Sequence, residues 1–197
     1  MPRIVDREVR RAELVSAAAS VFAQRGVANT AVSDIVKAAG VAQGTFYLYF
    51  DAKDDAVLAV VQRLADAVVE GTAARVAAAS SAVDKLLALP GVLSEVGAEP
   101  DAAGLVDLMH RPENRILHDR LAEDITRRLV PLLEAIIAQG VAEDVFSVDD
   151  PRAAAWFVLA GLQSVELAGT AISAMPAALA SATEFALRAL GYEGPWR

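Results

Sequence analysis

The stretch QGTFYLYF at residues 43–50 carries hydrogen-bonding and apolar side chains, without any charge, at helical spacing. At that spacing Phe46 and Phe50 share one face and are expected to pack inward. The remaining residues point away from this face or flank it: Gln43, Gly44, Thr45, Tyr47, Leu48 and Tyr49. Amide and hydroxyl groups bond base edges in the major groove of DNA, and a leucine can contact a thymine methyl. The segment therefore predicts a surface that reads DNA, with packing of the Tyr-Leu-Tyr-Phe run against the rest of the protein as the alternative.

A second set of residues places polar groups within otherwise apolar helical segments and indicates a ligand pocket. The polar members are His110, His118, Gln163 and Glu166, and the apolar walls would be Met109, Trp156 and Phe157. Small-molecule pockets are mostly apolar, with a few polar groups that orient the ligand. The alternative for each polar residue is a capping or core position with its own hydrogen-bond partner.

The residue types that catalysis or metal binding requires do not occur in the necessary arrangements. The chain has no cysteine, which excludes a thiol nucleophile, a disulfide and a zinc–thiolate site. Its two histidines, His110 and His118, do not have the i,i+4 spacing of a helical metal pair. The sequence contains no Gly-x-Ser-x-Gly motif, no P-loop and no Gly-x-Gly-x-x-Gly after a strand. We therefore expect a protein that is not an enzyme and that needs no cofactor or metal ion.

Charge is divided unequally along the chain. The formal net charge is −8 over 197 residues, yet residues 1–53 hold seven Lys or Arg against five Asp or Glu. The remaining residues hold 11 basic and 21 acidic side chains. A mildly basic head on an acidic body indicates a local contact with a polyanion such as nucleic acid.

Neither the N-terminus nor the longest uncharged stretch has the character of an export or membrane segment. Hydrophobic residues make up 55% of the chain and charged residues 22%, which suits a folded core. The stretch from Leu167 to Thr183 is broken by Gly169 and Pro176, short of the roughly 20 apolar residues of a membrane span. The N-terminal MPRIVDREVRRAEL is charged where a secretory signal needs an apolar run. The expectation is a soluble cytoplasmic protein with no membrane partner.

Helical periodicity dominates the sequence, whereas strand alternation and hairpin turns are almost absent. We predict an all-α protein of about nine helices, bounded as Asp6–Gln24, Thr30–Ala39, Ala42–Phe50, Lys53–Ala79, Ala82–Val96, Ala102–His110, Glu113–Gln139, Pro151–Ala168 and Pro176–Leu190. Gly26 and Gly140 are expected to end their helices. Pro131 should kink its helix or start a new one, because an interior proline costs about 3 kcal/mol against alanine.

The second and third helices are predicted to form a helix-turn-helix. Thr30 is a suitable N-cap for the second helix. The tripeptide Ala39-Gly40-Val41 allows a tight turn, with Val41 filling the space between the two short helices. Gly44 on the third helix would let the backbone come close to DNA.

The stretch from Gly26 through Leu58, GVANTAVSDIVKAAGVAQGTFYLYFDAKDDAVL, resembles the DNA-binding head of the tetracycline-repressor (TetR) family. The resemblance rests on Gly26, Thr30, Val32, Ile35, Ala39-Gly40-Val41, Gly44-Thr45, Tyr47, Phe50, Lys53 and Leu58. It covers about the first third of the chain, and beyond Leu58 it is one of architecture only. It implies a homodimeric regulator with a three-helix head and a divergent helical body that binds an inducer.

The same resemblance implies roles for individual residues of the head. Gln43, Gly44 and Thr45 would contact bases or the DNA backbone, and Ser33 would contact a base. Phosphate contacts would come from the two tyrosines of the third helix and from Lys53. The complete predicted DNA-binding set is Thr30, Ser33, Gln43, Gly44, Thr45, Tyr47, Leu48, Tyr49 and Lys53.

We expect residues 1–52 to form the helix-turn-helix DNA-binding domain and residues 53–197 the effector-binding and dimerisation domain. The resemblance implies that the helices Pro151–Ala168 and Pro176–Leu190 form a four-helix bundle with those of a second copy. Small residues on both helices would permit close approach. A monomer in which both helices are internal is the alternative.

A pocket near the Glu113–Gln139 and Pro151–Ala168 helices would hold a small, largely apolar effector. Its predicted contacts are Met109, His118, Trp156, Phe157, Gln163 and Glu166. The predicted function is that of a homodimeric repressor, released from a near-palindromic operator in double-stranded DNA when the effector binds. The alternative is an effector-independent DNA-binding regulator, either an activator or an orphan repressor; a non-DNA adaptor or an enzyme fits the sequence less well.

Overall fold

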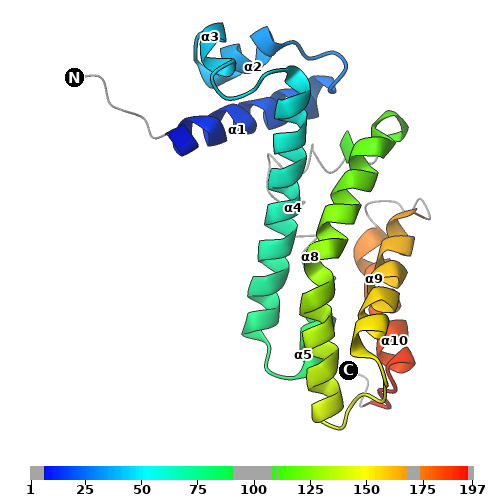
Figure 1. The fold of residues 1–197 in the computed structure, drawn as a ribbon. Coiled ribbons are helices and arrows are strands. Elements are labelled where there is room, and N and C mark those ends of the chain that lie inside the picture. The colour runs from blue at the N-terminus through cyan, green and yellow to red at the C-terminus, as the bar shows by residue number, and fades with distance from the viewer. Residues whose placement is uncertain (1–6, 91–107, 110, 168–173, 195–197) are drawn as a thin grey trace. The chain divides into compact units, whose positions relative to one another are not determined.

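The computed structural model describes residues 7–90, 108–109, 111–167 and 174–194, which form helices joined by turns (Figure 1). The α-helices are α1 (Arg7–Arg25), α2 (Val32–Ala39), α3 (Gln43–Phe46), α4 (Lys53–Ala78), α5 (Ala82–Ala88), α8 (Arg115–Ala142), α9 (Pro151–Leu167) and α10 (Met175–Ala189). A 3-10 helix, Pro112–Asn114, precedes α8. These ranges contain no strand, and the all-α prediction is confirmed.

The chain divides into two compact units. The first comprises Met1–Asp66 and Gly97–Ala122, and the second comprises Ala67–Val96 and Glu123–Arg197. Helices α4 and α8 each begin in the first unit and end in the second. The domain boundary expected at residue 52 falls inside the first unit, immediately before α4. Among the described helices, none combines the length and apolar character needed to cross a lipid bilayer.

A small apolar core fixes α1, α2 and α3 in the first unit. The buried residues of α1 recur at helical spacing: Leu14, Val15, Ala18, Ala19, Val21 and Phe22. Helix α2, which contacts both α1 and α3, buries Ile35, and α3 buries Phe46. Burial of a large apolar side chain contributes about 1.5 to 3 kcal/mol relative to exposure. This core therefore determines which faces of α2 and α3 remain exposed.

Glycine ends each of the first two helices. Gly26 has a φ of 80°, and its N–H donates to the carbonyl oxygen of Phe22 over 2.8 Å. Gly40 has a φ of 67° and is followed by a hydrogen bond from the Val41 N–H to the Val36 oxygen, at 3.0 Å. Glycine adopts this left-handed conformation without a steric penalty. The predicted stop at Gly26 and the turn at Gly40 are confirmed.

Two predicted boundaries in the helix-turn-helix are wrong. Helix α2 begins at Val32 with Ala31, not Thr30, as its N-cap, and Oδ2 of Asp34 accepts the Ala31 N–H at 3.0 Å. The Asp34 side chain thus satisfies a backbone donor at the helix start, where a threonine cap was expected. Helix α3 ends at Phe46 rather than Phe50, and residues 47–49 form a turn.

Later boundaries also differ from the predictions. Helix α5 ends at Ala88 instead of Val96, and residues 91–96 lie outside the described residues. The same is true of most of the predicted Ala102–His110 helix. Helix α8 runs unbroken through Pro131 and ends at Ala142, so no new helix starts at the proline and Gly140 does not end the helix.

The second unit is organised around an apolar cluster on α5, α8, α9 and α10. Its most buried members, each at most 1% exposed, are Ala82, Leu86, Leu133, Ile137, Ala155 and Leu187. At one end, Gln139 receives a hydrogen bond from Nζ of Lys85 (2.7 Å) and donates to the Ser80 carbonyl oxygen (2.8 Å). The pKa of Glu143 is lowered mainly by a hydrogen bond from the Gln139 side chain. The Ala82 N–H and the positive charge of Lys85 lower it further. These bonds tie the start of α5 to the end of α8.

Candidate nucleic-acid interface

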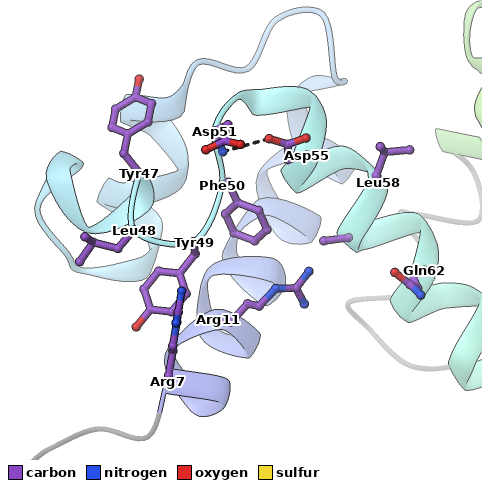
Figure 2. Close-up of a pocket in the computed structure, with 11 residues that line it drawn as sticks. Arg7, Arg11, Tyr47, Leu48, Tyr49, Phe50, Asp51, Asp55, Leu58 and Gln62 are labelled. Carbon is purple, nitrogen blue, oxygen red and sulfur yellow. Dashed lines mark hydrogen bonds between the residues drawn. The ribbon is translucent and has the colours of Figure 1, made fainter.

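The turn after α3 presents two side chains outward and holds a third inward. Phe50 is buried, and its ring centroid lies 5.3 Å from that of Phe46. Tyr47 and Leu48 are 53% and 68% exposed, and Figure 2 shows both pointing away from Phe50. A solvent-facing leucine is costly to leave in water, since burial is the favoured state of such a side chain. The two buried phenylalanines thus fix an outward face on which the Leu48 side chain is largely exposed to solvent.

The first residues of α3 complete this outward face. Gln43 and Gly44 are exposed and Thr45 is half-buried. A Cβ added to Gly44 would have no heavy atom within 4 Å, so the protein's own packing does not require a glycine here. Gln43 and Thr45 offer an amide and a hydroxyl group beside that bare backbone. The reading face, defined as residues 43–45, 47 and 48, therefore has the donors, acceptors and apolar contact that base edges require.

Two other predicted contacts take different positions. Ser33 is exposed on the first turn of α2, where its hydroxyl is available to DNA. Thr30 is only 3% exposed, and its hydroxyl donates to the Gly26 carbonyl oxygen at 2.8 Å. Its side chain therefore supports the loop before α2 rather than lying on the surface. Tyr49 is half-buried beside the reading face.

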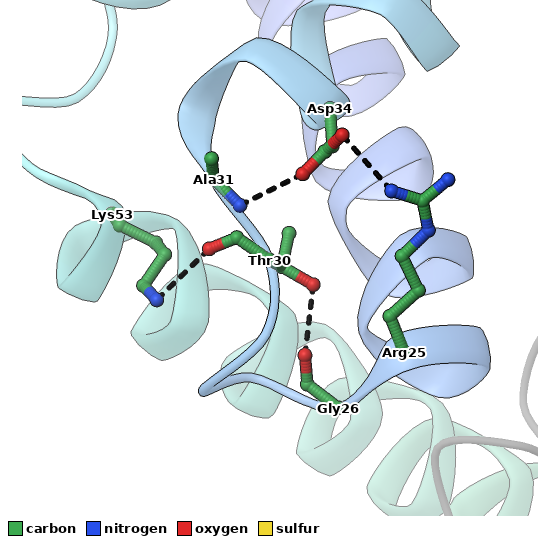
Figure 3. A network of polar contacts seen from close by, with 6 residues as sticks. All are labelled: Arg25, Gly26, Thr30, Ala31, Asp34 and Lys53. Atoms are coloured by element: carbon green, nitrogen blue, oxygen red, sulfur yellow. Dashed lines mark hydrogen bonds and ion pairs between the residues drawn. The ribbon is translucent and has the colours of Figure 1, made fainter.

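Lys53 joins the start of α4 to the loop between α1 and α2 (Figure 3). Its ammonium group donates to the carbonyl oxygens of Val27 and Thr30, at 2.8 and 2.9 Å. An ammonium group has three donors, so one remains for a phosphate, and the phosphate contact stays a prediction. In the same network, Arg25 pairs with Asp34 at 3.0 Å. The segment that leads into α2 is thus fixed by hydrogen bonds from Lys53 of α4 and by the ion pair of Arg25 at the end of α1.

Removal of the Lys53 ammonium group should destabilise the head. We expect Lys53→Met to lower the free energy of unfolding by about 1.5 kcal/mol or more, because hydrogen bonds to charged groups contribute about that much. Lys37→Met, on the exposed side of α2, is the matched control and should change stability by less than about 0.5 kcal/mol. Urea unfolding followed by circular dichroism measures both. Equal midpoints for the two variants would show that the carbonyl contacts of Lys53 contribute nothing.

An open groove of about 430 Å³ runs beside the reading face (Figure 2). Its walls come from α1, from the turn after α3 and from α4. Arg7 and Arg11 line it from α1, and both are exposed. Neither arginine is among the residues predicted from the sequence to bind DNA. Their signal was the i,i+4 spacing of two like charges on the same line of α1 as Leu14 and Ala18, one and two turns before the buried residues begin.

The predicted effector residues lie in different environments. Met109 is buried and His118 is half-buried, with Nδ1 3.8 Å from Oδ1 of Asp119; both fall in the first unit. Gln163, in the second unit, is half-buried and donates from Nε2 to Oγ1 of Thr126. His110 lies outside the described residues, as does the side chain of Glu166.

Trp156 and Phe157, predicted as pocket walls, are 49% and 64% exposed. They belong to an exposed stripe along α9, whose other members are Ala153, Ala160, Gly161 and Ser164. Helix α10 contacts α9 and leaves Phe185 exposed in the same unit. We call the α9 stripe together with Phe185 the α9–α10 face. Large exposed aromatic side chains of this kind mark an interaction surface.

Two family models match the chain. One, described as "Bacterial regulatory proteins, tetR family", matches residues 14–60, and the other, "Tetracyclin repressor-like, C-terminal domain", matches residues 102–166. The first match covers α2 and α3 and the turn that carries the reading face.

Individual proteins are also similar to the chain. An uncharacterized HTH-type transcriptional regulator of Bacillus subtilis, YvdT, is 44% identical over 52 residues, 26% of this chain and 27% of that protein. The fatty acid metabolism regulator protein of the same organism is 28% identical over 130 residues, which is 66% of each. The chain thus spans between about a quarter and two thirds of these relatives. A TetR-family transcriptional regulator from Pectobacterium atrosepticum superposes with a TM-score of 0.74 at 23% identity, covering 98% of this chain and 100% of that one.

Proposed function

Because the chain belongs to the TetR family of bacterial regulatory proteins, we propose that it is a transcriptional regulator that binds double-stranded DNA in the cytoplasm. The observation that carries the proposal is the reading face, which is uncharged, exposed and fixed from behind by Phe46 and Phe50. In the major groove, Gln43 and Thr45 bond base edges and Leu48 contacts a thymine methyl. Gly44 lets the helix backbone approach the DNA. Ser33 and Tyr47 lie at the border of this contact.

The role of Gln43 is tested by selecting preferred sites from a random pool of DNA duplexes. We expect Gln43→Ala to change the base preference at one position per half-site, since a bidentate amide contact is worth about 1 to 3 kcal/mol of discrimination. Gln24→Ala, on the exposed side of α1, is the matched control and should select the wild-type sequence. An unchanged preferred sequence for Gln43→Ala would remove Gln43 from base reading. Failure of the wild-type protein to enrich any sequence would remove the function itself.

The regulator acts as a homodimer through the α9–α10 face. Support comes from the two exposed aromatic residues of α9 and from Phe185 of α10, which a second copy would cover. The small residues Ala160 and Gly161 follow one turn later on the same exposed stripe of α9 and permit close helix approach. A two-fold protein presents two equal reading faces, so its operator is a near-palindrome.

A small, largely apolar effector releases the repressor from its operator. The Bacillus subtilis relative that is 28% identical is named as a regulator of fatty acid metabolism. Its name supports an effector that is largely apolar. The hydrogen bond between Gln163 and Thr126 joins α9 to α8 and offers a polar group for such a ligand. The effector shifts an equilibrium between two conformations of the dimer that differ in the distance between the DNA-binding heads. It releases DNA to the extent that it binds more tightly to the conformation that does not bind the operator.

Effector binding is tested by thermal unfolding in the presence of fatty acids and acyl-CoA esters of increasing chain length. A ligand at about 100 times its Kd should stabilise the protein by about 2.7 kcal/mol. Gln163→Leu should reduce the shift, and Gln62→Leu, an exposed glutamine on α4, should not. The exposure of Trp156 and Phe157 favours a second candidate, an effector-independent regulator in which both residues serve the dimer contact. The absence of a shift with every ligand would favour that candidate.

A further inference from the structure

The groove beside the reading face has one basic wall, formed by the first two turns of α1. Arg7 and Arg11 are four residues apart, which puts them on the same side of the helix. Within the described part of the chain, neither guanidinium group forms an ion pair, whereas Arg10 between them pairs with Glu13. The two guanidinium groups in the groove are therefore available to an external anion.

Arg11 is held in place by an aromatic ring. Its guanidinium carbon lies 5.4 Å from the ring centroid of Phe50, which is itself buried. A guanidinium group stacked in this way keeps its N–H donors in the plane of the group, where they can bond phosphate oxygens. Arg7 and Tyr49 also line the groove. The α1 wall thus offers two guanidinium groups that suit a phosphate.

The opposite wall carries two acidic residues, which restrict where an anion can lie. Asp55 accepts the backbone N–H groups of Asp51 and Ala52, each at 2.9 Å, so its charge is stabilised at the start of α4. The Asp51 side chain is exposed and repels an anion from that side. An anion in the groove would therefore lie against α1.

The groove is continuous with the reading face, because Tyr47 and Leu48 line both. A DNA strand that borders the major groove read by α3 has its phosphates next to this opening. We propose that the groove is a binding site for the DNA sugar–phosphate backbone, with Arg7 and Arg11 as its phosphate ligands. The proposal rests on the DNA-binding function and extends the interface to α1, outside the helix-turn-helix.

Salt dependence of DNA binding separates a phosphate contact from a general loss of charge. Each phosphate contact contributes about 0.9 to the slope of log K against log salt concentration. The probe is a fluorescein-labelled duplex of mixed sequence and about 30 base pairs, bound by the full chain at about 50 to 200 mM salt. The variants are Arg7→Gln, Arg11→Gln and the control Arg10→Gln, which removes the same charge from the same helix.

We expect Arg7→Gln and Arg11→Gln each to lower the slope by about 0.9 for each head bound and to weaken binding about tenfold. Arg10→Gln should leave the slope at its wild-type value. Because Arg11→Gln also removes the contact with Phe50, circular dichroism checks its fold, and Arg7→Gln decides the outcome if Arg11→Gln unfolds. An unchanged slope for Arg7→Gln, or an equal loss for Arg10→Gln, would overturn the groove as a phosphate site. Failure of the wild-type protein to bind any duplex would instead overturn the proposed function.

Discussion

The substitution Phe157→Glu is expected to produce a monomer at micromolar concentration and to weaken binding to a two-fold symmetric DNA site by at least about 100-fold. In a single chain the Phe157 side chain is 64% exposed, so a glutamate there meets water and the fold is retained. Against a second copy the same carboxylate would be buried without a partner. Loss of the dimer then removes the linkage between two reading faces, which is the source of the large effect on affinity. Light scattering and DNA titration measure the two consequences.

Ile116→Glu is the matched control for that experiment. Ile116 is 72% exposed near the start of α8 and belongs to neither α9 nor α10, and the change in charge and size is similar. This variant should remain dimeric and bind DNA like the wild type. Phe185→Glu, on α10, should reproduce the monomer. A dimer that survives both Phe157→Glu and Phe185→Glu would exclude the α9–α10 face as the contact between copies.

The head was predictable because its signals are local. Periodic apolar residues define α1, and Gly26 and Gly40 occupy the positive-φ positions that end α1 and α2. The end of α3 was not predictable from the same pattern. In the run Phe-Tyr-Leu-Tyr-Phe the two phenylalanines pack inward whether the segment is a helix or a turn. The pattern therefore gave the buried side correctly and the helix length incorrectly.

The contacts of Lys53 depend on the folded chain rather than on local sequence. Its acceptors, the carbonyl oxygens of Val27 and Thr30, lie 26 and 23 residues away along the chain. From sequence alone, a lysine at the start of a helix is expected to face solvent or to contact a phosphate. Nothing in the local sequence predicts a hydrogen bond to a distant backbone oxygen. Thr30 illustrates the same point, because its hydroxyl group bonds to Gly26 instead of capping α2.

The apolar residues of α9 were the hardest to assign. The helix is apolar on several sides, with Ala155, Val158 and Leu159 buried and Trp156 and Phe157 exposed. When apolar residues surround a helix, periodicity does not distinguish a side that packs within the chain from one that meets a ligand or a second copy. Exposure in the folded chain supplies that distinction, and it favours the dimer contact.

Gly140→Ala is expected to lower the free energy of unfolding by about 3 kcal/mol, the upper end of the cost of overpacking. A Cβ at this buried position in α8 would lie 2.7 Å from Cγ of Phe146 and closer to two further ring atoms. The ring cannot move aside easily, because Val145 and Phe146 both donate their N–H groups to the Gly140 oxygen, at 3.0 and 3.1 Å. Phe146 also belongs to the apolar cluster of the second unit. This clash outweighs the gain of about 1 kcal/mol that alanine normally brings to a helix interior.

Two further variants test whether the clash is the cause. Gly44→Ala is the control, because a Cβ there has no heavy atom within 4 Å, and its unfolding midpoint should equal or exceed that of the wild type. Phe146→Leu removes part of the ring and is destabilising by itself, since it leaves a cavity. Combined with Gly140→Ala it should cost less than the sum of the two single changes, because the added methyl group then occupies space that the ring has vacated. If the changes in the free energy of unfolding are strictly additive in chemical denaturation, the cost of Gly140→Ala arises elsewhere in α8. The contact with Phe146 then does not contribute to it.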